Sequence, residues 1–360
     1  MVNTWNDKSA TVRKGEELQM NNLQSYLEQY LSVDGELKIS QFPSGYSNLT
    51  YLVQFGNMEY VLRRPPIGAN IKSGHDMKRE YDILTALKPN YGKVPTPILY
   101  CEDESILGCP FYLMERVEGV ILRAKMPAAM LPDPELMLGI SNNFVDTLVD
   151  LHQLDIKEIG LDDFGKPEGY MERQVDGWTK RYFKSKTDLV PKIEAAANWL
   201  EENMPKEPKS YTLIHNDFKY DNLVLDPQDW TQVKAVLDWE MATIGNPLMD
   251  LGTTLGYWVN PNDPDFMKVL NLTPTNLLGN LSREELVQQY TLKSGREVNN
   301  IVFYYVYGLF KIAVIIQQIY YRYKKGVTQD PRFEKLIDGV RLLGEISNQA
   351  ITKNRLDHLF

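Results

Sequence analysis

Apolar and polar residues follow two different periods in the N-terminal part of the chain. Where every second residue is apolar, the pattern predicts a half-buried strand; where apolar residues recur every three or four positions, it predicts a helix. The predicted strands are residues 37–42, 50–55, 59–64, 98–101 and 110–116. The predicted helices are residues 16–31 and 75–87, followed later in the chain by residues 142–153 and 177–184.

The order of these elements predicts an α+β protein with two lobes. Strands, a helix and more strands come first, and mainly helical periodicity follows. A length of 360 residues suits two lobes better than one. We expect a small, mostly antiparallel β lobe over residues 1–116 and a larger, mainly helical lobe over residues 117–360.

Residues 301–321 form the longest apolar run in the second half of the chain. Its length would allow a membrane-spanning helix. Lys311, Gln317 and Gln318 interrupt the run, and a charge near the centre of a bilayer is costly. We therefore predict a buried helix of the larger lobe, with a membrane helix as the alternative.

The candidate chemistry lies on two short loops, each of which follows an apolar run. The first loop carries His215, Asp217 and Asn222 in the pattern H-x-D-x-x-x-x-N. In phosphoryl transfer an Asp at this spacing can accept the hydroxyl proton, and the Asn can hold Mg²⁺. Residues 211–214 and 223–225 are predicted to enter and leave this loop as strands.

A second acidic loop strengthens this interpretation. Residues 226–229 read as a turn, and residues 232–237 as the returning strand of a hairpin that ends at Asp238. Such a hairpin would bring Asn222 and Asp238 together. Mg²⁺ prefers oxygen ligands and retains several waters, so one carboxylate and one carboxamide are enough protein ligands. The alternative is a polar surface loop, because Asp and Asn are common turn residues.

With these motifs the chain resembles the aminoglycoside phosphotransferase and choline kinase family, which has the protein-kinase-like fold. The residues that carry the resemblance are His215, Asn216, Asp217, Asn222, Asp238, Trp239, Glu240, Asp250, Leu251 and Gly252, together with the run from Gly245 to Leu251. Residues 172–178 resemble a bacterial branch of provisionally assigned aminoglycoside phosphotransferases, a branch similar to the kinase-like domain of some acyl-CoA dehydrogenases. The resemblance covers most of the chain, from about residue 38 to about residue 340.

The resemblance implies a set of nucleotide-binding residues in the small lobe. Ser44 and Ser47 lie between two predicted strands, where backbone N–H groups and hydroxyls could hold the β- and γ-phosphates; an ordinary hairpin turn is the alternative. The hinge between the lobes would be residues 115–119, with Glu115 and Val117 beside the nucleotide.

Arg63 occupies the strand position where protein kinases carry their phosphate-binding Lys. Strand alternation places Val61 and Arg63 on one face, and the guanidinium of Arg63 could hold two phosphate oxygens. Glu80 in the following helix is its expected ion-pair partner. Arg64 would take this place if a one-residue bulge shifted the strand.

The remaining residues are assigned roles by the same resemblance. Lys219 would neutralise the transferred phosphoryl group, or would be an exposed loop lysine. His215 would brace the catalytic loop, and Asp250 would anchor it from the next helix. Glu240 would add a carboxylate near the metal. His152 lies on an apolar helical stripe, and we expect a core histidine there rather than a ligand.

Bulk composition narrows the class of protein. The net charge of −9 argues against a basic nucleic-acid-binding face. Two cysteines in 360 residues favour a reducing compartment over a disulfide framework. The polar N-terminus does not read as a signal peptide, and we expect a cytoplasmic protein. The four histidines are scattered, so a zinc site is not expected.

Together these features predict an enzyme that transfers the γ-phosphoryl group of ATP, with GTP as the alternative, to a hydroxyl of a small molecule. Mg²⁺ would be the metal, and nucleic acid and membrane partners are not expected. The oligomeric state and the acceptor stay open. A polycationic antibiotic acceptor would need Asp263, Asp265, Glu284 and Glu285 to converge. The rival interpretation is a catalytically silent nucleotide-binding regulator.

Overall fold

The computed structural model describes residues 8–32, 35–43, 48–66, 75–270 and 272–360. By internal contacts the chain divides into two units. Unit 1 is Met1–Ile121 with Asn222–Met241, and unit 2 is Leu122–Asp221 with Ala242–Phe360. The lobe boundary expected between residues 116 and 117 stays a prediction. Ser44 and Ser47 lie outside the described residues.

Unit 1 is built on a five-stranded antiparallel sheet with the strand order β1-β2-β3-β5-β4. The strands are β1 (Leu37–Gln41), β2 (Leu49–Phe55), β3 (Met58–Arg64), β4 (Pro97–Cys101) and β5 (Phe111–Glu115). The helices are α1 (Met20–Leu27), α2 (Met77–Leu87) and α3 (Glu104–Leu107). All five predicted strands are confirmed with small differences at their ends, and the first predicted helix is shorter than expected.

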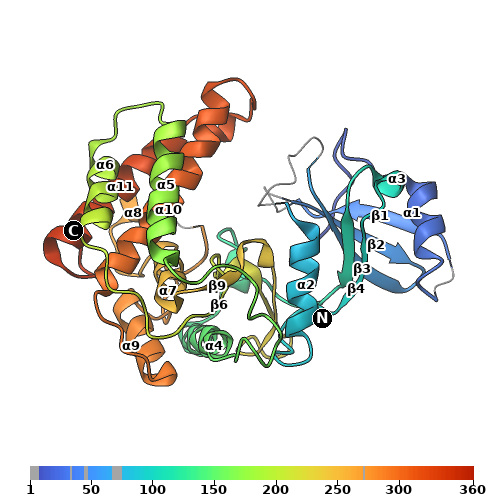
Figure 1. The fold of residues 1–360 in the computed structure, drawn as a ribbon, viewed down its shortest axis with the longest axis horizontal. Helices are drawn as coiled ribbons and strands as arrows, with labels where there is room; N and C mark the ends of the chain where they lie inside the picture. The colour runs from blue at the N-terminus through green and yellow to red at the C-terminus, as the bar shows by residue number, and fades with distance from the viewer. Residues whose placement is uncertain (1–7, 33–34, 44–47, 67–74, 271) are drawn as a thin grey trace. The chain divides into compact units, whose positions relative to one another are not determined.

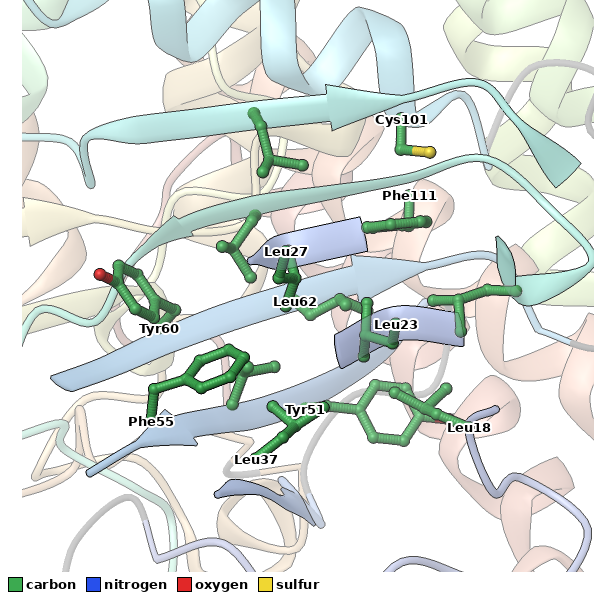
Figure 2. Close-up of a cluster of buried hydrophobic side chains, with 14 of the residues drawn as sticks. Leu18, Leu23, Leu27, Leu37, Tyr51, Phe55, Tyr60, Leu62, Cys101 and Phe111 are labelled. Atoms are coloured by element: carbon green, nitrogen blue, oxygen red, sulfur yellow. The ribbon is translucent and has the colours of Figure 1, made fainter. Parts of the chain in front are cut away.

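The two faces of this sheet have different roles. One face packs with α1 and α3 into an apolar core that includes Leu23, Tyr51, Leu62 and Phe111 (Figure 2). Helix α2 lies against the opposite face (Figure 1). Because side chains alternate along β3, Leu62 enters the core and Arg63 faces the side of α2.

A short hairpin completes unit 1. Strands β7 (Leu223–Leu225) and β8 (Val233–Val236) pair antiparallel, and the 3₁₀ turn η3 (Trp239–Met241) follows. Leu225 exchanges backbone hydrogen bonds of 2.7 and 2.9 Å with Val120, and a Cβ on Gly119 would overlap the Leu225 carbonyl oxygen. The Leu237 N–H donates to the Asn222 carbonyl at 2.8 Å. The predicted hairpin is therefore confirmed, and it joins the segments that carry Asn222 and Asp238.

Unit 2 is mainly helical. Its helices are α4 (Pro134–His152), α5 (Tyr170–Ser185), α6 (Pro191–Glu202), α7 (Pro247–Gly256), α8 (Asp265–Lys268), α9 (Arg283–Ser294), α10 (Ile301–Lys324) and α11 (Leu336–Lys353). Its short elements are β6 (Thr212–Ile214), which pairs with β9 (Thr243–Gly245), and the 3₁₀ turns η1 (Ala128–Met130), η2 (Tyr220–Asn222) and η4 (Pro331–Phe333). The helices predicted at 142–153 and 177–184 are the C-terminal parts of longer helices.

Helix α10 is the core helix of unit 2. It is long and apolar enough to cross a membrane, yet 78% of its apolar window is buried inside the structure. It packs against α5, α6, α7 and α11, and Lys311 and Gln317 are both only 1% exposed. The interpretation of residues 301–321 as a buried helix is confirmed.

Glycine allows α7 and α10 to approach closely. A Cβ on Gly308 would overlap the carbonyl oxygen of Gly252, and a Cβ on Gly252 would overlap the carbonyl of Tyr304. Both obstacles are backbone atoms of a neighbouring helix, which cannot rotate away. The position of α7 therefore depends on the absence of side chains at this crossing.

We predict that Gly308→Ala lowers the free energy of unfolding by at least about 2 kcal/mol, because the helices must separate. Urea denaturation monitored by circular dichroism measures the change. Gly177→Ala is the matched control, because a Cβ there meets only the Arg181 guanidinium at an ordinary 3.5 Å. The control should be neutral or stabilising by up to about 1 kcal/mol. Equal losses in both variants would contradict the role of the crossing.

Candidate functional site

Arg63 is the centre of a charged cluster in unit 1. Its Nη1 lies 2.6 Å from Glu80 Oε1, and its Nη2 lies 2.9 Å from Asp238 Oδ1 and 3.5 Å from Glu240 Oε2. We call these four residues the Arg63 cluster. One guanidinium thus contacts three carboxylates that come from two segments of the chain, helix α2 and the segment that follows β8.

Local structure explains how these side chains meet. Asp76 caps α2 by accepting from the Arg79 N–H at 3.0 Å, which starts the helix so that Glu80 falls in its first turn. The β7–β8 hairpin carries Asp238 and η3. The ion pair expected between Arg63 and Glu80 is therefore present in the structure.

Arg64, the alternative to Arg63, faces the other side of the sheet. Its charge acts on Tyr51 and Cys109, and its Nε lies 3.4 Å from the Pro65 carbonyl oxygen. The register of β2 with β3 shows no bulge at this point. Regular strand alternation therefore selects Arg63 as the partner of Glu80.

Burial and charge oppose each other in the Arg63 cluster. Burial alone would lower the pKa of Arg63, but the charges of Glu80 and Asp238 hold it well above its ordinary value. Burial raises the pKa of Glu80 to about 7, although the charge of Arg63 acts in the opposite direction. The Arg63 side chain therefore stays positively charged beside acids that are costly to bury.

Asp238 differs from Glu80 in exposure and backbone conformation. The Asp238 side chain is 34% exposed, against 1% for Glu80. Its φ is +68°, in the left-handed region that residues other than glycine adopt rarely. A strained, partly exposed acid at the end of a strand is typical of a functional position.

The oxygen donors in unit 1 fit magnesium better than zinc. Asn222, Asp238 and Glu240 offer only oxygen ligands, and a single oxygen of Asp238 bonds Arg63. Within the described ranges of the chain, His, Cys, Asp and Glu form no group of three that could hold a metal. A few oxygen ligands suit Mg²⁺, which keeps its own waters, whereas zinc sites use closed sets of His and Cys.

Glu240 has a partner that the sequence did not indicate. Asn48 donates from Nδ2 to Glu240 Oε2 at 2.7 Å, and its Oδ1 lies 2.8 Å from His75 Nδ1. Asn48 directly follows the undescribed residues that include Ser44 and Ser47. Asn48 therefore links Glu240 of the Arg63 cluster to His75.

The two expected hinge residues lie at the end of β5. The Glu115 N–H donates to the Thr96 carbonyl at 2.8 Å, and the Glu115 carboxylate accepts from the Thr96 hydroxyl at 2.5 Å. Val117 packs against a small apolar cluster of Ile121, Val224 and Ala235. The contact of these residues with a nucleotide stays a prediction.

Unit 2 contains the loop with the candidate base, and Asp250 holds its backbone. The N–H groups of His215 and Asn216 each donate to the Asp250 carboxylate at 2.7 Å. His152 Nε2 lies 3.1 Å from the same carboxylate, and His152 Nδ1 lies 2.8 Å from the Tyr290 hydroxyl. His152 is therefore the core histidine that we expected. Asp250 makes the contacts of an anchor.

Asn216 is held on both sides of its backbone and at its side chain. Its φ is +65°. Tyr170 donates from its hydroxyl to Asn216 Oδ1 at 3.1 Å, and Lys311 donates from Nζ to the Asn216 carbonyl at 2.6 Å. Three helices, α5, α7 and α10, thus maintain a strained residue directly before Asp217.

Both carboxylate oxygens of Asp217 have partners. The Tyr257 hydroxyl donates to Oδ1 at 2.8 Å, and Lys219 Nζ lies 2.5 Å from Oδ2. The Asp217 N–H donates to His215 Nδ1 at 3.2 Å, so the imidazole nitrogen there is an acceptor. Burial would raise the pKa of Asp217, but the charge and hydrogen bond of Lys219 outweigh it and hold that pKa below its ordinary value.

Sequence reasoning missed several residues with contacts in these clusters, among them Lys311, Asn48 and Tyr257. Lys311 carried a signal, because a charge in a long apolar run requires a partner. Asn48 and Tyr257 carried none, because their spacing from Glu240 and Asp217 in the sequence follows no local period.

Comparisons with known proteins give a consistent family relationship. Residues 38–273 match the profile of the phosphotransferase enzyme family. The structure superposes with a TM-score of 0.78 on a protein from Ralstonia eutropha that is provisionally called an aminoglycoside phosphotransferase, at 29% identity, covering 94% of this chain and 99% of that one. An aminoglycoside phosphotransferase crystallised with GDP and kanamycin shares the fold, with a TM-score of 0.60 and 14% identity over 94% and 100% of the two chains. The expected α+β kinase-like fold is confirmed.

The curated relatives are longer proteins. Acyl-CoA dehydrogenase family member 11 of Rattus norvegicus is 36% identical over 314 residues, which are 85% of this chain and 40% of that protein. Family member 10 of Mus musculus is 34% identical over 319 residues, 88% of this chain and 29% of that protein. The chain therefore spans less than half the length of these relatives.

We predict that Asp250→Asn lowers the free energy of unfolding by about 3 kcal/mol or more, because an amide group would face two backbone N–H donors in a buried site. Urea denaturation at neutral pH measures this loss. The control is Asp176→Asn, which removes an exposed ion pair with Lys180 and should change stability by less than about 1 kcal/mol.

The pH dependence of unfolding gives a second readout. The pKa of Asp250 lies below its ordinary 3.8 because the His152 and backbone hydrogen bonds outweigh burial. Its contribution is therefore complete above pH 3.8 and is lost as pH falls through the lower folded-state value. The variant should lack this acid dependence. An unchanged acid limb in Asp250→Asn would contradict the assignment.

Proposed function

Because the chain belongs to the phosphotransferase enzyme family, we propose that it transfers the γ-phosphoryl group of ATP to a hydroxyl of a small molecule with Mg²⁺. GTP is the alternative donor. The observation that carries this proposal is the Arg63 cluster, in which the candidate phosphate-binding residue Arg63 is held by the buried Glu80 and lies beside the candidate metal ligand Asp238.

The Arg63 cluster supplies the nucleotide-binding part of the proposal. Glu80 fixes one side of the guanidinium, and the other side can exchange the Asp238 carboxylate for phosphate oxygens. Asn222, Asp238 and Glu240 would hold Mg²⁺, which when bound neutralises charge on the phosphates. The relatives crystallised with GDP or ADP support a nucleotide as the donor.

Asp217 is the residue that we assign to the acceptor hydroxyl. Its lowered pKa makes it a weak base, so it orients the hydroxyl and takes the proton late, as the P–O bond forms. Tyr257 and Lys219 fix the direction of the carboxylate. Lys219 is also placed to offset charge on the transferred group.

The acids of residues 255–345 do not support a polycationic acceptor. Asp263 forms a buried ion pair with Arg283, at 2.6 Å. The Asp265 side chain is 95% exposed on α8. Glu285 closes a capping box with Ser282 at the start of α9. Asp263 and Glu285 therefore already have structural partners.

We therefore favour an acceptor without several positive charges. The names of the curated relatives support testing a hydroxyacyl thioester first. Aminoglycosides and amino alcohols are the comparison acceptors, and ATP-dependent mass gain of each compound identifies the class. Phosphorylation of aminoglycosides alone would overturn this preference.

We predict that Asp217→Asn reduces kcat at least about 100-fold and leaves the Kd for Mg²⁺–ATP within about threefold, because the lost carboxylate acts on the hydroxyl. Coupled ADP release and calorimetric titration measure the two quantities. Asp226→Asn makes the same change in the exposed β7–β8 turn and should keep full activity. Nucleotide binding without turnover in the wild type would instead favour the silent regulator.

We predict that Asp238→Asn weakens ATP binding about tenfold or more when Mg²⁺ is present and little when it is absent, because the change removes a carboxylate from the metal. Titration calorimetry with and without MgCl₂ measures both constants. Asp229→Asn, in the turn between β7 and β8, is the control. Equal weakening in both conditions would show that Asp238 does not hold the metal.

A further inference from the structure

Lys311 lies in the middle of the most apolar helix of the chain. It is 1% exposed, and its neighbours on α10 include the buried residues Tyr307, Gly308 and Val314. A buried ammonium is costly unless it is bonded to specific partners. The role of Lys311 therefore depends on the groups that its ammonium contacts.

The Lys311 ammonium contacts the backbone of the candidate catalytic loop. It donates to the Asn216 carbonyl at 2.6 Å and lies 5.9 Å from the centre of the Trp178 ring. The Asn216 carbonyl belongs to the same peptide group as the Asp217 N–H, which donates to His215 Nδ1. This peptide group is thus held at its oxygen by α10 and at its nitrogen by the loop histidine.

Asp250 accepts hydrogen bonds from the N–H groups of His215 and Asn216, which belong to the two preceding peptide groups. Together Asp250 and Lys311 therefore bond three consecutive peptide groups. We propose that Lys311 is a positioning residue that fixes the Asn216–Asp217 peptide and thereby the direction of the Asp217 carboxylate. The proposal rests on the proposed function, in which Asp217 orients the acceptor hydroxyl.

The positive charge of Lys311 interacts with the charged groups around the loop, which a neutral hydrogen-bond donor would not do. The charges that act on Lys311 are Asp250 from α7, Arg181 from α5, and Asp217 and Lys219 from the loop. The two carboxylates favour the ammonium, and the two cations oppose it. Lys311 therefore links the packing of α10 to the charge balance of the loop as well as to its geometry.

The same surroundings predict a pH dependence. Burial lowers the pKa of Lys311 to about 8, against the opposing effect of Asp217 and Asp250. The ammonium form is present below that pH and is lost above it. In the wild type kcat should therefore fall as pH rises through about 8.

The experiment compares three variants of the full chain. Lys311→Met removes the donor and the charge, and Lys311→Arg keeps both. Gln317→Met is the matched control, because Gln317 is equally buried on α10 and donates to a backbone carbonyl outside the loop, that of Ser185 at 2.8 Å. The readouts are kcat, KM for nucleotide and acceptor, the thermal midpoint, and hydrogen exchange of the amides in residues 212–220.

We expect Lys311→Met to lower kcat at least tenfold and to leave the KM values within threefold. Amide exchange at residues 215–218 should become faster. The fall of kcat near pH 8 that we expect in the wild type should be absent. Lys311→Arg should recover part of kcat and move this fall to higher pH. Gln317→Met should keep kcat within twofold even where its thermal midpoint falls. Proportional loss of kcat and stability in both Met variants, or an unchanged pH profile in Lys311→Met, would overturn the proposal.

Hydrogen exchange separates this proposal from the proposed function. If the wild type turns over no nucleotide with any acceptor, the proposed function fails. Faster loop exchange in Lys311→Met, with Gln317→Met unchanged, would then still show that Lys311 fixes the loop. If Lys311→Met stays active and its amide exchange is unchanged, the positioning role of Lys311 is rejected and the proposed function stands.

Discussion

The buried carboxylate of Asp250 is the constraint on which the candidate catalytic loop depends. It lies on α7 and accepts hydrogen bonds from two consecutive backbone N–H groups, while His152 contacts it from α4. A buried carboxylate without such partners would be strongly destabilising. Because α7 crosses α10 at Gly252 and Gly308, the helical packing of unit 2 sets the position of this carboxylate.

In each unit a residue with positive φ lies at or directly beside a candidate site residue. Asn216 and Asp238 both have positive φ values, which Asn and Asp tolerate better than most residues. In unit 2 the strain lies directly before the candidate base, and the bonds from Asp250, Tyr170 and Lys311 maintain it. In unit 1 it lies at the candidate metal ligand, which Arg63 holds. Strain supported by many bonds is typical of a preorganised site.

The two units carry different arrangements of charge, which the proposed function would use in different ways. The Arg63 cluster gathers acids around one cation, which suits a metal and the phosphates of a nucleotide. In unit 2, Lys219 of the loop lies beside the Asp217 carboxylate, and Lys311 of α10 bonds the backbone directly before it. Among the acids of residues 255–345, Asp263 serves an ion pair and Glu285 a helix cap.

Local periods and short motifs in the sequence were enough to predict the strands of unit 1, the β7–β8 hairpin and the family. The sequence also indicated Arg63 over Arg64 and Asp250 as an anchor, since strand alternation and motif position are local too. The tertiary structure decided that Asn48 binds Glu240, that Tyr257 and Lys311 contact the loop, and that Asp263 pairs with Arg283. These contacts join residues far apart in the chain. No periodic pattern encodes them, because they follow from how helices and strands pack after they form.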